Sequence, residues 1–525
     1  MAVKGVLPLA PTVFAMSAGT DLAWRRAVSA LEAGRLNDAE DALREITPGA
    51  LSGAATVQAM ASLPGLPAAR SLAVWAELRQ RQLQFDEARS LYLAALELDP
   101  LHYGALCNLG ILESEAGRTA QCEALLQRAI AADPARPNAY VNLGTAFEAA
   151  RRHADAITLY QTALRHAPDH ALIHFNLGSA NFALGRLDAA IAAWRATIRC
   201  DAGFGEVYWN LAQALFLRGD FTPAWAALEQ RWRSSQFAGF KPMFAQPQSQ
   251  WQGEDLRGKR LLLWGEQGFG DQIQFARFAT PAAARGAVVI LAVRRELLDL
   301  CADIAGVAQC VDVDQDLPPF DVHCALLDLP QRLHTTAISI PPAPYLRASD
   351  ALQPTWATRM PQPRRLRVGL VWSSGMSVHN RRLQDASVIR SFTLATYAPL
   401  WRQAADFFSL QVDARAEETG TPVIDWSGDL HSFADTAALM SHLDLVISVD
   451  TAAAHLAGAL GIPVWILLRR PADWRWGEGA AASPTASRWY ASARLFRQTN
   501  AGDWSAAVAE AADALAGLIA ARPQA

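Results

Sequence analysis

A period of 34 residues runs through the first half of the chain and constrains its fold more than any single motif does. The units start at Ala69, Tyr103, Pro137, Ala171 and Gly205. Their seventh and eighth positions combine a large residue with a small one, as Trp75-Ala76, Leu109-Gly110, Leu143-Gly144, Leu177-Gly178 and Leu211-Ala212. Position 24 is large again, as Tyr92, Leu126, Tyr160, Trp194 and Leu228. We therefore expect two helices in each unit, meeting in a seam of small and large side chains.

Proline closes three of these units, where it ends the second helix, at Pro100, Pro134 and Pro168. The pattern resembles the tetratricopeptide repeat (TPR), a helix pair whose copies stack into a curved α-solenoid. A degenerate unit at about residues 20–53 has Gly34 at its turn and Ala39, Leu43 and Ile46 on its second helix. The resemblance implies a TPR domain over residues 20–238, with clear repeats from residue 69 and an interruption at 63–67.

The first helices of stacked TPR units line a concave surface that suits an extended peptide or a helix of another protein. Asparagine recurs at position six of these helices, as Asn108, Asn142, Asn176 and Asn210. Because an amide both donates and accepts hydrogen bonds, these side chains are candidates for binding the backbone of a protein acceptor. They can equally be solvated surface residues. The array itself can instead be a spacer or a homodimer interface.

After Trp232 the period ends, and a connector rich in proline and glutamine predicts a linker at residues 239–258. Apolar strand candidates separated by helical stretches then form two series, at 259–345 and 364–520. The expected strands lie at 261–264, 288–293, 322–327, 368–372, 407–411, 445–449 and 464–468. This α/β pattern predicts two Rossmann-like lobes with parallel sheets facing a cleft, and ligands at the carboxyl ends of the strands.

A glycine-rich turn follows the first strand of the first lobe, where Gly268 and Gly270 let the backbone approach a ligand closely. Asp271 ends this turn and is the candidate general base, because a carboxylate in a cleft can take the proton of an attacking hydroxyl. Its alternative role is to cap the helix that it opens. The turn lacks both the third glycine of a dinucleotide fingerprint and the lysine of a P-loop. An NADP site that uses Arg294 is an alternative.

The second lobe carries the candidate residues for a nucleotide sugar. Asp450, Thr451 and Ala452 run from a strand into a helix whose open N–H groups favour a diphosphate. His455 lies one turn further and is interpreted as a donor contact or as a buried, hydrogen-bonded histidine. The hydroxyls and the guanidinium suited to phosphate oxygens belong to Ser373, Ser374 and Arg390.

Two further segments of the second lobe have open interpretations. The Arg381-Arg382 pair can contact phosphate or belong to a solvated loop. The tryptophans of the segment Asp473–Trp476 can stack on a base or sugar, or pack in the core.

The segments 265–275, 368–375, 443–465 and 474–476 together resemble family 9 glycosyltransferases, which are heptosyltransferase-like enzymes of the GT-B fold. With the repeats, the resemblance extends over about residues 69–515 to bacterial TPR glycosyltransferases, including those that modify flagellin. It implies that Asp271 is the base of an inverting, metal-independent transfer that needs no cofactor. It also assigns the Asp450–His455 segment and, at the phosphate, Ser373, Ser374 and Arg390 to the nucleotide-sugar donor.

The resemblance leaves the substrates open, because true heptosyltransferases have no TPR array and continue differently after the aspartate. Fusions of TPR repeats with glycosyltransferases use the repeats to recruit protein acceptors. We therefore expect O-glycosylation of serine or threonine, with flagellin as a candidate acceptor and a CMP-linked nonulosonic acid as a candidate donor. The alternatives are a non-catalytic TPR scaffold or assembly factor, and a transferase directed at a glycan or lipopolysaccharide.

The bulk composition limits the other classes of partner. A net charge of −4 gives no reason to expect nucleic acid. The six cysteines form no C-x-x-C pair, which favours a reducing compartment, and no apolar run reaches the roughly 20 residues of a membrane span. The apolar stretch Val6–Met16 contains two prolines and does not favour a cleaved signal peptide. We expect a cytoplasmic protein.

Overall fold

The computed structural model describes residues 18–46, 68–240, 243, 248–266, 268–362, 365–374, 390–412, 420–477 and 485–522. The stretch 6–16, the interruption at 63–67, the end of the degenerate repeat at 47–53 and the Arg381-Arg382 pair lie outside these residues. The chain forms two compact units, Met1–Phe204 and Gly205–Ala525. We refer to them as the first and second units.

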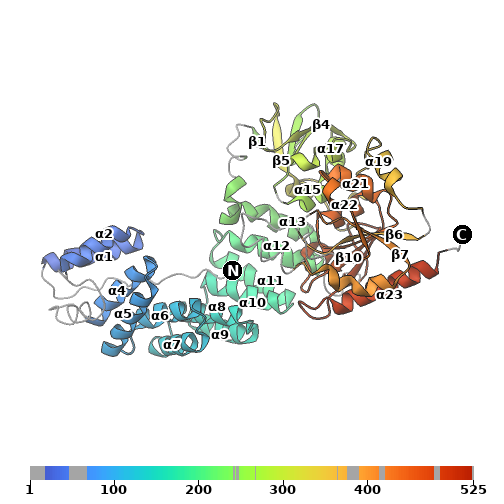
Figure 1. The fold of residues 1–525 in the computed structure, drawn as a ribbon. Coiled ribbons are helices and arrows are strands. Elements are labelled where there is room, and N and C mark those ends of the chain that lie inside the picture. Colours follow the sequence, from blue (N-terminus) through green and yellow to red (C-terminus); the bar gives the residue numbers. More distant parts are fainter. Residues whose placement is uncertain are drawn as a thin grey trace. The chain divides into compact units, whose positions relative to one another are not determined.

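The first unit consists of antiparallel helix pairs (Figure 1). The helices are α1 (Ala18–Glu32), α2 (Leu36–Ile46), α4 (Ala68–Arg81), α5 (Phe85–Leu98), α6 (Tyr103–Glu115), α7 (Thr119–Ala132), α8 (Pro137–Ala149), α9 (His153–His166), α10 (Ala171–Ala183) and α11 (Leu187–Cys200). Every predicted repeat start in this unit falls within one residue of a helix start. The predicted TPR solenoid is confirmed. The degenerate repeat forms α1 and α2, with Ala39, Leu43 and Ile46 buried.

The predicted seam of small and large residues is where the two helices of each repeat touch. A methyl group on Gly144 would collide with the ring of Tyr160, and one on Gly178 would collide with Trp194. The same relation holds between Gly110 and Leu126. In these three repeats glycine at position eight is therefore required by the bulky residue at position 24, because the two helices approach more closely than a β-carbon allows.

The fifth repeat, α12 (Glu206–Arg218) and α13 (Phe221–Glu229), belongs to the second unit. The predicted repeat domain of 20–238 therefore extends across the boundary at Phe204. The reason is aromatic packing. Phe216 stacks on Trp474 with ring centroids 4.3 Å apart, and Trp225 contacts both Trp474 and Phe275 edge-on. Two short 3-10 helices follow, η1 (Gln230–Arg233) and η2 (Ser235–Phe240).

The first lobe of the second unit contains a five-stranded parallel sheet in the order β1-β5-β2-β3-β4. Its strands are β1 (Ser249–Gln250), β2 (Arg260–Trp264), β3 (Val288–Val293), β4 (Val307–Asp312) and β5 (Val322–Ala325). The prediction of a linker over all of 239–258 is wrong at β1, which pairs with β5. The adjacent Trp251 is fully buried, so this segment belongs to the lobe. Sequence patterns also missed β4, which is mostly half-buried or exposed.

The second lobe contains a six-stranded parallel sheet in the order β11-β10-β9-β6-β7-β8. The strands are β6 (Leu366–Val371), β7 (Ala405–Ser409), β8 (Val423–Asp425), β9 (Leu445–Val449), β10 (Val464–Leu468) and β11 (Ala493–Arg497). The strands β6, β9 and β10 are almost wholly buried, which is typical of a parallel sheet between helical layers. The second unit is thus α/β (Figure 1).

Helices that pack around the two sheets include α15 (Phe269–Ala276), α18 (Leu329–Arg332), α21 (Phe433–Met440), α22 (Ala452–Leu460), η8 (Trp474–Trp476) and α23 (Ser505–Ala520). Of these, α15, α22 and η8 carry residues of the candidate site. The lobes contact each other through α15 and α22. A cavity of about 740 Å³ lies elsewhere, beside the loop from Val313 to Phe320 between β4 and β5. The cleft between the lobes remains a prediction.

Candidate active site

Both sheets change winding direction at one point, and the candidate residues lie there. In the first sheet, the chain proceeds from β2 through β3 to β4 and then returns to β5 on the other side of β2. In the second sheet, it proceeds from β6 through β7 to β8 and then returns to β9 on the other side of β6. Ligands of doubly wound sheets bind beyond the carboxyl ends of the strands at such switch points. Here the residues that follow β2, β6 and β9 contain the predicted site.

The glycine-rich turn after β2 places α15 close to the second lobe. Gly268 lies at the N-cap of α15, and a β-carbon added there would have no other residue within 4 Å beyond its chain neighbours. Gly270 faces α22, where a β-carbon would lie 3.0 Å from the His455 ring and 3.6 Å from Ala452. A larger residue at this position would separate the two helices. Glycine therefore serves close approach between the lobes, which brings Asp271 in the first turn of α15 to the interface.

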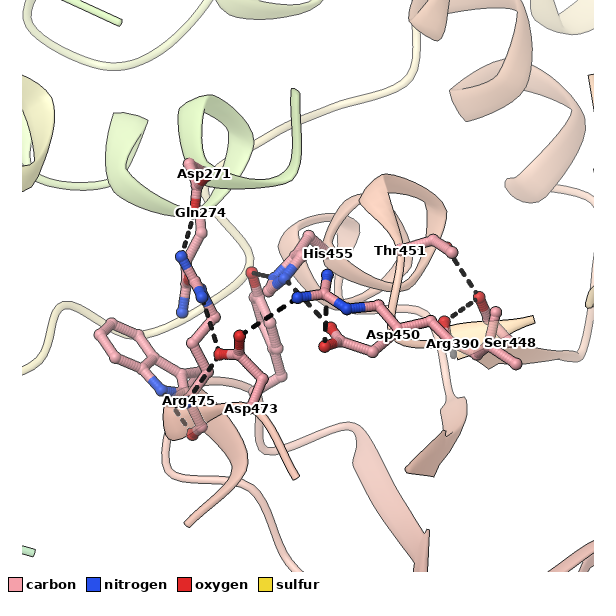
Figure 2. Close-up of polar contacts among 12 residues, drawn as sticks. Asp271, Gln274, Arg390, Ser448, Asp450, Thr451, His455, Asp473 and Arg475 are labelled. Atoms are coloured by element: carbon pink, nitrogen blue, oxygen red, sulfur yellow. Dashed lines mark hydrogen bonds and ion pairs between the residues drawn. The ribbon is translucent and has the colours of Figure 1, made fainter. Parts of the chain in front are cut away.

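Asp271 forms an ion pair with Arg475 of η8, across the interface between the lobes (Figure 2). The side chain of Asp271 is 17% exposed and that of Arg475 is 10% exposed. Burial raises the pKa of Asp271, and the Arg475 guanidinium opposes this rise. A base with a raised pKa binds a proton more strongly than an exposed carboxylate does, which suits proton abstraction. The placement is compatible with the role predicted for Asp271, which remains a prediction.

Arg475 also contacts Asp473, and the pair forms the centre of the cluster. Nη1 of Arg475 lies 2.7 Å from Oδ1 of Asp473, and the backbone N–H of Arg475 donates to the same oxygen at 3.1 Å. Burial would raise the pKa of Asp473, but the guanidinium groups of Arg475 and Arg390 outweigh it and lower the pKa to about 2. Asp473 is therefore a carboxylate at every physiological pH.

Arg390 connects this pair to the end of β9. Its guanidinium lies 3.5 Å from Asp473 and 3.9 Å from Asp450. Burial raises the pKa of Asp450, and Arg390 opposes that rise. Nε2 of His455 lies 3.9 Å from Asp450, and its Nδ1 is 3.0 Å from the Tyr490 hydroxyl. Burial, reinforced by Arg475, lowers the pKa of His455 well below its usual value, so the ring is neutral.

The hydroxyl groups predicted to hold phosphate form a small network at the end of β6. The Ser373 hydroxyl donates to that of Ser391 at 3.1 Å, and the backbone N–H of Ser374 donates to Ser391 at 3.1 Å. Arg390 is thereby fixed beside Ser373 and Ser374 through its chain neighbour. On the adjacent strand, the hydroxyls of Ser448 and Thr451 are 3.0 Å apart, and Thr451 is the N-cap residue of α22.

Ala452 is the first residue of α22, and the Thr451 side chain makes no capping hydrogen bond to this helix. The first N–H groups of α22 therefore receive no side-chain acceptor from their N-cap. Because such groups at a helix start carry a partial positive charge, they favour an anion. Among the described residues, no three side chains of His, Cys, Asp or Glu are placed to hold a metal ion.

The candidate asparagines of the repeats lie deeper than a solvated surface residue would. Asn108, Asn142 and Asn176 are buried on α6, α8 and α10, while Asn210 on α12 is half-buried. The interpretation of the first three as solvated surface residues is therefore wrong. Their role in binding a protein acceptor remains a prediction.

Trp474 and Trp476 pack in the core, as one of the two interpretations of their segment predicts. Trp474 is buried against Phe216, Trp225 and Trp489. Trp476 is buried and stacks on the His455 ring, with centroids 5.3 Å apart. The Arg294 guanidinium lies 5.3 Å from the Phe269 ring centroid, and its alternative role in an NADP site remains a prediction.

Sequence reasoning missed several charged residues of the second unit, among them Arg475, Arg231 and Asp328. Arg475 was overlooked because its aromatic neighbours dominate the segment that contains it. Arg231 and Asp328 carry no motif at all, yet they meet in a fully buried ion pair. The available signal was an aspartate directly after an apolar strand, which often lies at the carboxyl edge of a parallel sheet.

The tetratricopeptide repeat family model matches residues 74–137, 107–162 and 141–203. These residues are TPR repeats, and they support a role in protein interaction. Protein FlbA of Caulobacter vibrioides is 28% identical to the chain over 326 residues, which cover 55% of this chain and 52% of FlbA. The chain thus matches about half the length of that curated relative. In the described residues, no helix is both long and apolar enough to cross a membrane.

Several solved structures are similar to about a third of the chain. The crystal structure of MamA is 24% identical, covering 31% of this chain and 96% of that chain with a TM-score of 0.29. The structure of YrrB, a TPR protein with an unusual peptide-binding site, is 20% identical, covering 31% of this chain and 84% of that chain with a TM-score of 0.28.

Proposed function

We propose that the chain is a glycosyltransferase that moves a sugar from a nucleotide sugar to a serine or threonine hydroxyl of a protein recruited by the repeats. The observation that carries this proposal is the cluster at the switch points of two doubly wound sheets. Asp271 from one lobe pairs with Arg475 of the other, and Arg475 pairs in turn with Asp473, which also faces Arg390. Two α/β lobes that join a buried carboxylate to anion-binding groups suit group transfer from a phosphate.

The donor phosphates bind where three kinds of anion-binding group converge. These are the open N–H groups of α22, the hydroxyls of Ser373 and Ser374, and the Arg390 guanidinium. Hydroxyls and N–H groups donate to phosphate oxygens, and Arg390 stabilises the charge that develops on the leaving nucleotide. The two carboxylates that Arg390 faces keep it in place before the donor arrives.

The transfer is a direct displacement at the anomeric carbon. The acceptor oxygen attacks that carbon while Asp271 takes the hydroxyl proton. The bond from the anomeric carbon to the phosphate oxygen breaks, and the nucleotide leaves with the electron pair. No other reactant is needed, since the carboxylate of Asp271 becomes a carboxylic acid and later releases the proton to water.

The repeats supply the acceptor. Protein interaction is the role that TPR repeats support, and a recruited hydroxyl gains effective concentration at the second unit. Through the resemblance to flagellin-modifying enzymes, flagellin is the candidate acceptor and a CMP-linked nonulosonic acid is the candidate donor.

The test is a panel of CMP-, UDP- and ADP-linked sugars added to the full chain together with purified flagellin, the candidate acceptor, with thermal unfolding and nucleotide release both measured. We expect at least one donor to stabilise the wild type and the Asp271→Asn variant. Release should be lost in Asp271→Asn and retained in the matched control Asp303→Asn, which alters an exposed carboxylate of the same lobe. Indifference to every donor would contradict the proposal and favour a TPR scaffold.

A further inference from the structure

Arg475 contacts two residues of α15 from the opposite lobe. One guanidinium nitrogen pairs with Asp271, and Nε donates to the side-chain oxygen of Gln274 at 2.7 Å. Asp271 and Gln274 are three residues apart and so lie on one face of the helix. Because the guanidinium bonds to both side chains, it fixes the orientation of α15 about its own axis and the direction of the Asp271 carboxylate (Figure 2).

The guanidinium is held on its own side of the interface by several groups. Asp473 accepts from Nη1 and from the backbone N–H of Arg475. The indole N–H of Trp489 donates to the Arg475 carbonyl at 2.9 Å. The guanidinium carbon also lies 4.2 Å from the Trp474 ring centroid, which allows a cation–π contact. Arg475 therefore has little freedom to choose another rotamer.

The support for Arg475 reaches the last repeat. Trp474 precedes Arg475 and stacks on Phe216 of α12 at 4.3 Å, and it meets Trp225 of α13 edge-on at 6.2 Å. The fifth repeat thus sets the position of Trp474, and Trp474 limits that of Arg475. This explains physically why α12 and α13 pack in the second unit and not as a free end of the solenoid.

We propose that Arg475 is the positioning residue of the transfer: bonded to one carboxylate oxygen of Asp271, it leaves the other oxygen to take the acceptor's proton. This inference rests on the proposed function. Among the described residues, the Asp271 carboxylate has no hydrogen bond or ion pair besides the one with Arg475. An orienting group behind a catalytic base is a recurrent arrangement, in which the base is fixed by one atom and reacts through another.

Charge supports the same role. The charged groups around Asp271 are Arg475 of η8, Asp473 at the N-cap of η8, Arg390, and Asp450 after β9. The carboxylate of Glu266 lies in the turn after β2. Burial raises the pKa of Asp271, and Arg475 is the strongest of the groups that lower it. Without Arg475 the pKa of Asp271 would be higher, so the carboxylate would keep its proton to a higher pH. It could then act as a base only above that higher pKa.

The test uses three full-length variants, Arg475→Gln, Arg475→Lys and the control Arg494→Gln, an arginine of β11 whose side chain is 44% exposed. In Arg475→Gln we expect kcat to fall by about 100-fold with the donor KM unchanged, as a misplaced group does. The acidic limb of its pH profile should move up by about 1–3 units. Arg475→Lys should keep the wild-type limb, because it keeps the charge, but not the wild-type kcat.

Amide hydrogen exchange of residues 269–276 provides a readout that needs no activity. Exchange in this segment should accelerate in Arg475→Gln and remain unchanged in the control. A wild-type pH profile and kcat in Arg475→Gln would overturn the inference, as would unchanged exchange in α15. If the wild type transfers no sugar from any donor, the proposed function fails, and the exchange result alone decides whether Arg475 fixes α15. If Arg475→Gln does not fold, kcat and the exchange of α15 are measured in Arg475→Lys instead, and both should change, because a lysine ammonium lacks the forked geometry that bonds to Asp271 and Gln274 together.

Discussion

Replacing Arg231 with methionine should destabilise the second unit by about 3–5 kcal/mol at pH 9, because it leaves buried carboxylates without their counter-charge. Arg231 lies on η1, directly after the fifth repeat, and is fully buried. Its guanidinium pairs with Asp328 at 2.5 Å and with Glu266, and it donates to the Leu228 carbonyl at 2.9 Å. One positive charge thus serves two carboxylates at the carboxyl edge of the first sheet.

After the substitution, Asp328 and Glu266 would differ in the hydrogen bonds that they keep. Asp328 would keep hydrogen bonds from the Trp232 indole at 3.0 Å and from Gln250 at 3.2 Å. Glu266 would keep none from the described residues, since Arg231 is its partner at one oxygen and the other has none. The expected loss of unfolding free energy is therefore that of one buried carboxylate without a counter-charge, and this carboxylate is Glu266.

The pH dependence identifies that group. Burial raises the pKa of Glu266 in the wild type, Arg231 opposes the rise and Asp328 adds to it. Without Arg231 the pKa rises further, so the folded state binds a proton that the unfolded state releases above about 4.5. In the wild type the pKa of Glu266 is about 8, so this proton leaves through that pH, whereas the variant keeps it to a higher pH. The destabilisation caused by Arg231→Met should accordingly be smaller at pH 7 than at pH 9, where Glu266 is ionised and paired with Arg231 in the wild type.

Urea unfolding followed by tryptophan fluorescence at both pH values measures these differences. The control is Arg233→Met, two residues away and exposed, which should change the free energy of unfolding by less than about 0.5 kcal/mol. Adding Glu266→Gln to Arg231→Met should restore part of the loss and remove the pH dependence. A loss below about 1 kcal/mol in Arg231→Met, equal at both pH values, would refute the reasoning.

Three further outcomes follow from the structure. Gly144→Ala should cost about 1–3 kcal/mol in urea unfolding, because its methyl group meets the Tyr160 ring, and a cost near zero would show that the seam can open. The proton NMR signal of His455 should not shift between pH 8 and 5.5, since burial keeps the ring neutral, and a midpoint near 6.5 would contradict this. Asp271→Asn should abolish sugar transfer while partner capture by the repeats continues, and near-normal turnover would remove Asp271 from its role as base.

The predictable parts of the fold are those that depend on local sequence patterns. The repeat period and the small residue at position eight specify α4 to α11, because each unit contacts only its neighbours. The strands β3, β9 and β10 occupy the predicted residues, as continuous apolar runs buried on both faces. Strand β4 was missed because it is only partly buried and its sequence includes Gln309 and Asp312.

The site was predictable only within each lobe. Asp271 and the Asp450–His455 segment follow strands directly, so their place at a sheet edge is visible in the sequence. The partner of Asp271 was not visible, because 204 positions separate it from Arg475 and no spacing rule relates them. The allocation of the fifth repeat to the second unit likewise depends on contacts such as Phe216 with Trp474, which arise only when both elements are folded.

The most direct test of the central claim is the intact mass of proteins captured from cells by the full-length chain carrying Asp271→Asn. The captured proteins should be compared between cells that contain the wild-type chain and cells that lack it. The account predicts a captured partner that is heavier by one or more sugar masses when the wild type is present. A partner whose mass is the same in both kinds of cell would contradict transfer to a recruited protein.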